Sequence, residues 1–250
     1  MRTFAGMRIA LLADLHLADR PEDAHGVDTR ANLSRCVARL RQRRPDLAVL
    51  MGDYSLREPR RQDVEWACSR MQLAEVETLA IAGNHDDARH VAEVCVGEEA
   101  LIGERLYYRR DFGSTRALFL DTSKGYLERQ QTDWLQQNVQ GARGDTLVFM
   151  HHPPVELGVP FMDERHGFRD AGQEVFGILF GGATPVHVFC GHYHVARTAQ
   201  IGMHSVHACP STYFQLDATR DEFAVSHALP AMRHVELTGD QVRTWVEVLK

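Results

Sequence analysis

Three short apolar runs in the N-terminal part of the chain constrain the fold more than any other feature. They cover residues 8–13, 47–51 and 78–82, and each has the length and composition of a buried β-strand. The segments between them, 28–44 and 60–72, carry apolar residues at helical spacing and predict amphipathic helices. Strands that alternate with helices join through right-handed crossovers into a parallel sheet. The pattern therefore predicts an α/β fold.

The rest of the chain adds elements of both kinds and changes character near residue 195. Further strands are expected at 106–108, 117–120, 145–150 and 186–190, and further helices at 87–95, 128–139 and 174–180. From about residue 195 short alternating segments without helices predict antiparallel strands at 198–201, 203–207, 234–237 and 242–249. We therefore expect one mixed-sheet α/β domain over residues 1–250, in which the C-terminal strands add a second sheet.

Carboxylate, amide or imidazole side chains follow directly after five of the predicted strands. They are Asp14 and His16, Asp53, Asn84 and His85, His151 and His152, and His192 and His194. A single such residue is more often a cap, a turn or a satisfied polar group than a ligand. Because open α/β sheets carry their ligands at the carboxyl ends of the strands, the recurrence of these residues there indicates one shared site.

The donor types of this site favour a pair of metal ions. Carboxylate, amide and imidazole groups without thiolate suit Mn, Fe, Co or Zn, and the chain contains 14 histidines. Seven donors are too many for one ion. They suit two divalent or trivalent ions about 3.5–4 Å apart, the arrangement that catalyses phosphoryl hydrolysis.

Composition excludes some classes of function and leaves others open. The formal net charge of -6 argues against a protein that mainly grips nucleic acid, and no run approaches the ~20 apolar residues of a membrane span. The N-terminal apolar run is too short for a signal peptide, so a cytoplasmic location is expected. Five cysteines without a CxxC pair are expected to be reduced thiols; they are Cys36, Cys68, Cys95, Cys190 and Cys209.

The order of these motifs resembles that of the calcineurin-like metallophosphoesterases. The matching blocks are Asp14-x-His16, Gly52-Asp53, Gly83-Asn84-His85-Asp86, His151-His152-Pro153-Pro154 and Gly191-His192-x-His194. Within that superfamily the chain looks most like the class III cyclic-nucleotide phosphodiesterase and glycerophosphodiesterase branch, and the likeness runs from about Arg8 to Asp217. It implies a four-layer α-β-β-α sandwich with two mixed sheets.

The resemblance also implies a role for each residue of the site. One metal would be bound by Asp14, His16 and His194, the other by Asn84, His151 and His192, with Asp53 as the bridge. His85 would hydrogen-bond the phosphate or protonate the leaving alkoxide. Asp86 would orient its neighbours. His152 is either a support for His151 or a group just outside the ligands, and Tyr54 either packs under the adjacent helix or narrows the pocket mouth.

The expected activity is that of a dinuclear metal-dependent phosphodiesterase in which a metal-bridging hydroxide attacks a small phosphodiester. A 3′,5′-cyclic nucleotide is the favoured substrate. The alternatives are a glycerophosphodiesterase, a broad-specificity phosphomonoesterase or diesterase, a nuclease, and a metal-binding scaffold without turnover. The negative charge speaks against the nuclease, and the intact Asp53, Asn84 and His85 speak against the scaffold.

The loop 155–169 should overhang the metals and shape the substrate site. Its candidate contacts are Phe161, Met162, Asp163 and His166, of which Phe161 or Met162 could pack a base or another apolar leaving group. Arg57 and His25 are weaker candidates, because charged loop residues are usually only solvated. The region 101–113 is a candidate for a homodimer contact, although its pattern is that of an ordinary strand pair.

Overall fold

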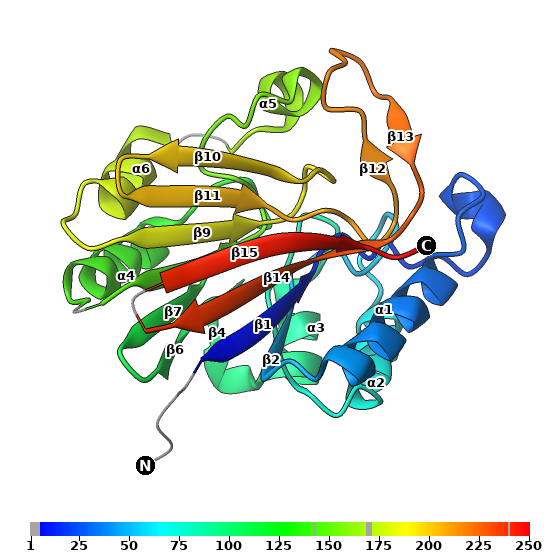
Figure 1. Cartoon of the computed structure of the whole chain (residues 1–250), viewed down its shortest axis with the longest axis horizontal. Coiled ribbons are helices and arrows are strands. Elements are labelled where there is room, and N and C mark those ends of the chain that lie inside the picture. Colours follow the sequence, from blue (N-terminus) through cyan, green and yellow to red (C-terminus); the bar gives the residue numbers. More distant parts are fainter. Residues whose placement is uncertain (1–5, 143, 169–171, 240) are drawn as a thin grey trace.

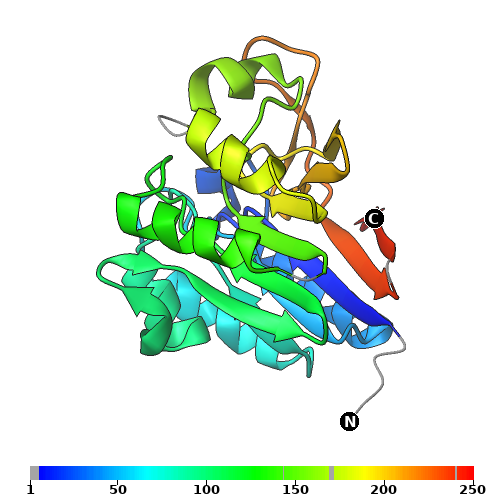
Figure 2. The ribbon, with the colours of Figure 1, turned by 90° about the vertical axis from the view of Figure 1, so that its left-hand side faces the viewer.

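A computed structural model describes residues 6–142, 144–168, 172–239 and 241–250 of the chain. Two mixed β-sheets lie face to face, and helices cover their outer faces (Figures 1 and 2). The four-layer sandwich expected from the sequence is therefore confirmed.

The first sheet contains the three N-terminal strands and the last two strands of the chain. Its order is β15-β14-β1-β2-β3, in which β1, β2 and β3 are parallel and β14 and β15 are antiparallel. The strands are β1 (Met7–Leu12), β2 (Leu47–Leu50), β3 (Glu77–Ala80), β14 (Ala231–Thr238) and β15 (Gln241–Val248). All four residues of β2 are buried, which explains its unbroken apolar sequence.

The second sheet has the order β10-β11-β9-β8-β7-β6. Its strands are β6 (Tyr108–Phe112), β7 (Thr115–Phe119), β8 (Thr146–Met150), β9 (Val186–Cys190), β10 (Arg197–Ile201) and β11 (His204–Ala208). The expectation that the strands after residue 195 form a sheet of their own is wrong, because β10 and β11 extend this sheet whereas β14 and β15 join the first. One pairing also differs, since β11 lies parallel to β9. Alternation along a strand reports which face is buried but not the direction of its partner.

Two helices cover the outer face of each sheet. α1 (Thr29–Arg43) and α2 (Arg61–Gln72) lie on the first sheet, and α4 (Arg129–Gln140) and α6 (Gly172–Phe180) lie on the second. α1 begins where the Asp28 carboxylate accepts a hydrogen bond from the Ala31 N–H at 2.9 Å. Its buried apolar face and a basic last turn agree with the predicted pattern.

Shorter elements connect these layers. They are η1 (Pro21–Ala24), α3 (Ala88–Val91), the π-helix η2 (Ala92–Val96), η3 (Glu98–Ala100), β4 (Leu101–Ile102), β5 (Arg105–Leu106), α5 (Pro160–His166), β12 (Gln215–Leu216) and β13 (Val225–His227). The loop predicted over 155–169 contains α5, which begins at Pro160, a residue whose fixed φ favours the first helical turn. Arg169, the end of that predicted loop, lies outside the described residues.

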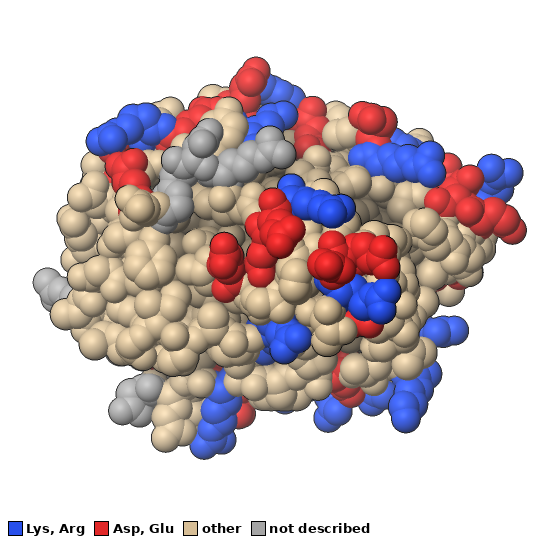
Figure 3. Space-filling view, turned by 90° about the horizontal axis from the view of Figure 1, so that it is seen from above, with Lys and Arg blue, Asp and Glu red and all other residues tan. Residues whose placement is uncertain are grey.

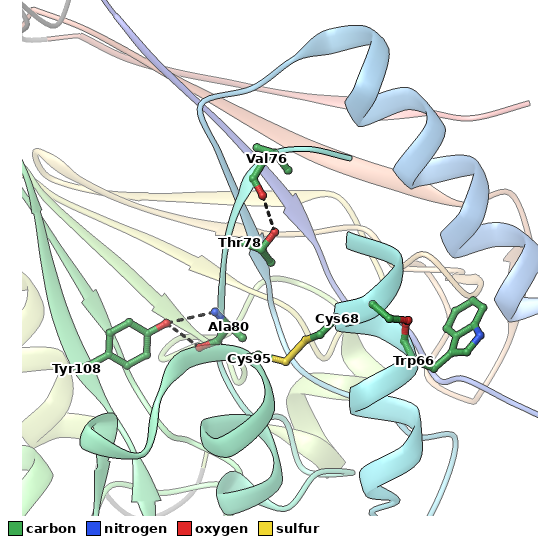
Figure 4. The surroundings of a disulfide bond; sticks show 8 residues. Trp66, Cys68, Val76, Thr78, Ala80, Cys95 and Tyr108 are labelled. Carbon is green, nitrogen blue, oxygen red and sulfur yellow. Dashed lines mark hydrogen bonds between the residues drawn. A yellow bond between two sulfur atoms is a disulfide. The ribbon is translucent and has the colours of Figure 1, made fainter. Parts of the chain in front are cut away.

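Aromatic rings fill the space between the two sheets. Tyr108, Phe119, Phe149 and Phe189 stack in sequence across the second sheet, with centroid separations of 4.5, 4.8 and 5.7 Å. The Tyr108 hydroxyl donates to the Ala80 carbonyl at 2.8 Å and accepts from its N–H at 3.2 Å, which ties the second sheet to the end of β3 (Figure 4). This layer fixes the two sheets against each other directly below the strand ends.

One expectation about the cysteines is wrong. Cys68 on α2 and Cys95 on η2 form a disulfide, with Cα atoms 6.1 Å apart (Figure 4). The other three cysteines are buried thiols, as expected. Pairing across 27 residues has no CxxC signature, so local spacing could not reveal it. No helix within the described ranges combines the length and the apolar character needed to cross a membrane. The cytoplasmic location and the homodimer contact stay predictions.

Candidate metal centre

The predicted site residues meet at the carboxyl ends of five parallel strands drawn from both sheets. β1, β2 and β3 lead into Asp14 and His16, Asp53, and Asn84 and His85, whereas β8 and β9 lead into His151 and His152, and His192 and His194. Backbone hydrogen bonds join neighbouring strand ends, as between the His16 N–H and the Asp53 carbonyl at 2.8 Å and between the Gly191 N–H and the His151 carbonyl at 3.0 Å. The two sheets therefore present their polar ends to one place.

Asp14, His16 and His194 form the first cluster. One potential ligand atom from each lies within 4.8 Å of the others. The Nε2 atoms of His16 and His194 are 3.1 Å apart, and His194 Nε2 lies 3.7 Å from Asp14 Oδ1. Two nitrogens at that separation match ligands of one ion, because metal–nitrogen bonds of about 2.0–2.1 Å place neighbouring ligands about 3 Å apart.

Asp53, His151 and His192 form the second cluster, again within 4.8 Å. His151 Nε2 lies 3.3 Å from Asp53 Oδ2 and 3.1 Å from Asn84 Oδ1. The same Asp53 oxygen lies 3.5 Å from His16 Nε2 in the first cluster. Asp53 thus stands between the two clusters.

The chemistry of these groups fits cations. His151 Nδ1 lies 2.9 Å from the Met51 carbonyl and His194 Nδ1 lies 3.1 Å from the Phe214 carbonyl, so each Nδ1 donates its proton to a backbone oxygen. In neutral rings this leaves the Nε2 lone pairs directed at carboxylates, an arrangement that a cation stabilises. Asp14 Oδ2 is buried and has no hydrogen-bond partner among the described residues. The donors present therefore suit two divalent ions.

The pKa values of the cluster residues are shifted by burial and by the charges of their neighbours. Burial raises the pKa of Asp14 to about 8, and Asp53 adds to the rise whereas His151 opposes it. Burial would lower the pKa of His151, but the attraction of Asp53 raises it to about 9. Burial lowers the pKa of His16 to about 4. Without a cation, some ligand atoms of the site therefore keep a proton. A bound cation would displace these protons.

Asp86 and two glycines hold the strand ends in place. The Asp86 carboxylate accepts hydrogen bonds from the N–H groups of Asp53 at 2.7 Å, Gly83 at 2.8 Å and Tyr54 at 2.8 Å. A Cβ on Gly83 would lie 2.2 Å from Asp53 Oδ1, and one on Gly52 would lie 2.5 Å from the Gly83 nitrogen. Glycine is required here by close approach of two chain segments. Asp86 has the orienting role that the sequence predicted.

His85 lies beside the clusters. Its N–H donates to Asp53 Oδ1 at 3.0 Å, and its Nδ1 lies 3.0 Å from the Arg57 carbonyl. Its ring meets the His16 ring edge-on, with centroids 4.9 Å apart. Because Nδ1 is engaged by the Arg57 carbonyl, Nε2 is the nitrogen that can form a hydrogen bond with a bound molecule.

His152 and Tyr54 are the two residues whose roles the sequence left open. The Thr122 hydroxyl oxygen accepts from the N–H groups of His151 and His152, at 3.1 and 3.0 Å, and lies 3.2 Å from His152 Nδ1. The Tyr54 side chain is fully buried in the core and does not reach the pocket mouth. Thr122 carries no motif and was missed, because only its place after β7 brings it to the site.

A cleft of about 410 Å³ opens over the centre. Of the predicted substrate contacts, Phe161, Met162 and His166 line it, and so do the weaker candidates Arg57 and His25. Asp163 does not, because its carboxylate accepts from the N–H groups of Leu157 and Val159 at 3.0 and 2.7 Å and so stabilises the start of α5. Another part of the lining was not foreseen. It consists of Tyr213, Phe214, Leu216 and Phe223, which lie in the segment from residue 213 to 223.

Comparison with known proteins gives a consistent result. A family model described as calcineurin-like phosphoesterase matches residues 7–196. A protein of Fibrobacter succinogenes named a probable cyclic nucleotide phosphodiesterase is 30% identical over 231 residues, which cover 92% of this chain and 89% of that protein. The glycerophosphodiester phosphodiesterase GpdQ of Enterobacter lignolyticus is 29% identical, with 84% and 79% covered. A dimetal phosphatase from Danio rerio has a similar fold, with a TM-score of 0.67 at 13% identity over 98% of this chain and 99% of that one.

Proposed function

Because the chain belongs to the calcineurin-like phosphoesterase family and is a metal-dependent phosphodiesterase, we propose that it hydrolyses 3′,5′-cyclic nucleotides at the centre formed by the strand ends. The observation that carries the proposal is the position of Asp53, whose Oδ2 lies 3.3 Å from His151 in one cluster and 3.5 Å from His16 in the other. A carboxylate shared in this way suits two ions rather than one.

We assign the ligands by cluster. Asp14, His16 and His194 would hold one ion, and Asn84, His151 and His192 would hold the other, with Asp53 between them. Mn, Fe, Zn and Co all suit this set of oxygen and nitrogen donors. Bound ions of this kind lower the pKa of a coordinated water and stabilise negative charge on phosphoryl oxygens.

We assign proton transfer to His85 and the orientation of the substrate to the residues that line the cleft. With the Nδ1–H donating to the Arg57 carbonyl, His85 can give a proton from Nε2 to the leaving oxygen of the ester when its ring is in the imidazolium form, and it becomes neutral as it does so. The bond from the His85 N–H to Asp53 Oδ1 keeps this imidazole in register with the bridging carboxylate. The residues that line the cleft would orient the organic group of the substrate.

A cyclic nucleotide suits the cleft better than a glycerophosphodiester does. The volume of about 410 Å³ is large enough for a nucleotide-sized molecule, and one wall is aromatic. A long nucleic acid is not favoured. On the face shown in Figure 3, the described Lys and Arg side chains are interspersed with Asp and Glu and form no continuous basic stripe. Glycerophosphodiester hydrolysis is the second candidate, supported by the likeness to GpdQ.

A substrate panel tests the proposal. The Mn-loaded protein is assayed with 3′,5′-cyclic nucleotides, glycerophosphodiesters and phosphomonoesters, and the cyclic nucleotides should have the highest kcat/KM. His85→Ala should lower kcat by about 100-fold or more, as expected for loss of a general acid. His90→Ala, on α3 outside both clusters, should leave kcat unchanged. Equal slow turnover of every ester would contradict the substrate assignment, and full activity of His85→Ala would contradict the mechanism.

A further inference from the structure

Four rings from three separate segments form one side of the cleft. They are His25, after η1, Phe161, on α5, Phe214, before β12, and Phe223, before β13. We call this set the aromatic wall. The ring of Phe223 is at its centre, with centroids 6.0 Å from Phe161, 5.8 Å from Phe214 and 6.1 Å from His25. Figure 1 shows α5 and the β12–β13 hairpin rising on the same side of the molecule.

The aromatic wall begins at the first metal cluster. The Phe214 ring packs on His194 with a centroid distance of 4.8 Å, and the Phe214 carbonyl lies 3.1 Å from His194 Nδ1. Phe223 in turn contacts Phe214, with ring centroids 5.8 Å apart. A phosphate at the metal centre would therefore have Phe214 beside it and Phe223 one ring further out.

Phe223 is exposed although the segment that carries it is closed by hydrogen bonds. The side chain is 49% exposed, whereas Phe214 is buried. The segment that carries it is closed by the Asp217 N–H, which donates to the Ala224 carbonyl at 2.8 Å, and by the Asp217 carboxylate, which accepts from the Thr219 N–H at 3.0 Å. A large apolar ring at the edge of a cleft, rather than packed into the core, is typical of a ligand contact.

Resting on the proposed function, we propose that Phe223 is a specificity-determining residue that stacks on the nucleobase of the substrate. The Phe161 and Phe214 rings meet Phe223 at steep angles of 67° and 83°, and the His25 ring is tilted against it by 35°. With these neighbours in place 49% of the Phe223 side chain is still exposed, which leaves ring surface for a planar partner. A base has such a π-face, and the glycerol group of a glycerophosphodiester does not. Stacking on the aromatic wall would therefore favour the binding of nucleotides over that of other small diesters.

Binding measurements separate this proposal from catalysis. We compare the Kd of adenosine 5′-monophosphate with that of ribose 5-phosphate, which lacks the base, on the Mn-loaded protein by calorimetry. The ratio of the two Kd values isolates the contribution of the base. Phe223→Ala should weaken nucleotide binding by about tenfold and leave ribose 5-phosphate binding unchanged, because one base–aromatic stack is lost.

Two further variants make the test specific. Phe223→Tyr keeps the ring and should retain the wild-type ratio of the two Kd values. Phe223→Leu keeps an apolar side chain without a ring and should lose most of the preference for the nucleotide. Phe176→Ala removes another exposed phenylalanine, 40% exposed on α6, and should change neither Kd. An unchanged ratio in Phe223→Ala, or equal weakening of both ligands, would overturn the proposal. Failure of the wild-type protein to hydrolyse cyclic nucleotides would overturn the proposed function instead, whatever the ratio.

Discussion

Asp86 should be the residue outside the ligand set whose loss disturbs the centre most. Its side chain accepts three backbone hydrogen bonds at 2.7–2.8 Å, from Asp53, Gly83 and Tyr54, and is 9% exposed. Asp86→Ala would leave three donors facing a cavity in the protein interior. Hydrogen bonds to charged groups contribute about 1.5–3 kcal/mol each, but the contributions are not additive, and burial of the carboxylate already costs part of them. We expect the free energy of unfolding to fall by about 3–5 kcal/mol.

Asp86→Ala should also lower the rate of catalysis, because it changes the position of the Asp53 carboxylate. The Asp53 N–H and the Gly83 N–H would no longer be held together, so the bridging carboxylate would shift relative to both clusters. A displacement of about 1 Å in a catalytic group costs about 100-fold in rate. We therefore expect kcat/KM to fall by about that factor even at saturating metal. Asp86→Asn should be intermediate, because the amide nitrogen cannot accept a hydrogen bond.

Asp87→Ala is the matched control. Asp87 is the next residue, and its carboxylate accepts one hydrogen bond, from the Arg89 N–H at 2.8 Å at the start of α3. Loss of this cap should cost about 1 kcal/mol and leave kcat/KM unchanged. Unfolding is measured in urea at one fixed metal concentration, since metal binding itself adds to stability. A cost below about 1 kcal/mol for Asp86→Ala, or equal effects of the two variants, would refute the reasoning.

Two further predictions concern stability away from the centre. Cys68→Ser should lower the free energy of unfolding by about 3.5 kcal/mol under oxidising conditions, because the disulfide with Cys95 closes a loop of 27 residues, and it should have no effect in the presence of a reductant. Burial tends to raise the pKa of Glu247, but hydrogen bonds with Arg43 and His234 outweigh it and lower the pKa overall. The stability that Glu247→Gln removes should therefore be present above pH ~4.3 and vanish as the pH falls through the folded-state pKa, which urea titrations between pH 3 and 7 would detect.

The strand ends were predictable because their signal is local. An apolar run followed by Asp53 or by Asn84 and His85 specifies both a buried strand and the group at its end. Parallel strands of one sheet bring such groups to the same edge, and the packing of the two sheets brings the two edges together. The two clusters therefore assemble as expected from the sequence. Supporting residues such as Asp86 could also be predicted from the sequence, because they lie within the motif.

The rest depends on contacts between segments that are far apart in the chain. Phe161 and Phe223 meet only because α5 and the β12–β13 hairpin lie side by side, and Phe223 is not distinguished by its local pattern. The same is true of the Cys68–Cys95 bond and of the division of the last strands between two sheets. Asp163 was misassigned for the opposite reason. It looked free in a loop, but it stabilises a helix that the loop contains.

The backbone of the centre explains why its motifs have the form Asp-x-His and His-x-His. Asp14, His16, His192 and His194 all have positive φ values, of 55°, 42°, 67° and 51°. Aspartate and histidine are among the few residues other than glycine that adopt this region readily. Leu15 and Tyr193, the residues at the x positions, are each 1% exposed, so each motif directs two polar groups to the site and buries the side chain between them.

This geometry has an energetic consequence for the whole protein. Each left-handed position costs about 1 kcal/mol or more, so four of them together consume a substantial part of the ~5–15 kcal/mol by which a domain is stable. The packed core of the two sheets must hold the strand ends in this conformation, and the fully buried strand β2 and the aromatic stack beneath them are placed to do so. Ions that bind only the folded centre offset the strain by mass action. The stability of the fold and its capacity to bind metal are therefore linked through the same backbone positions.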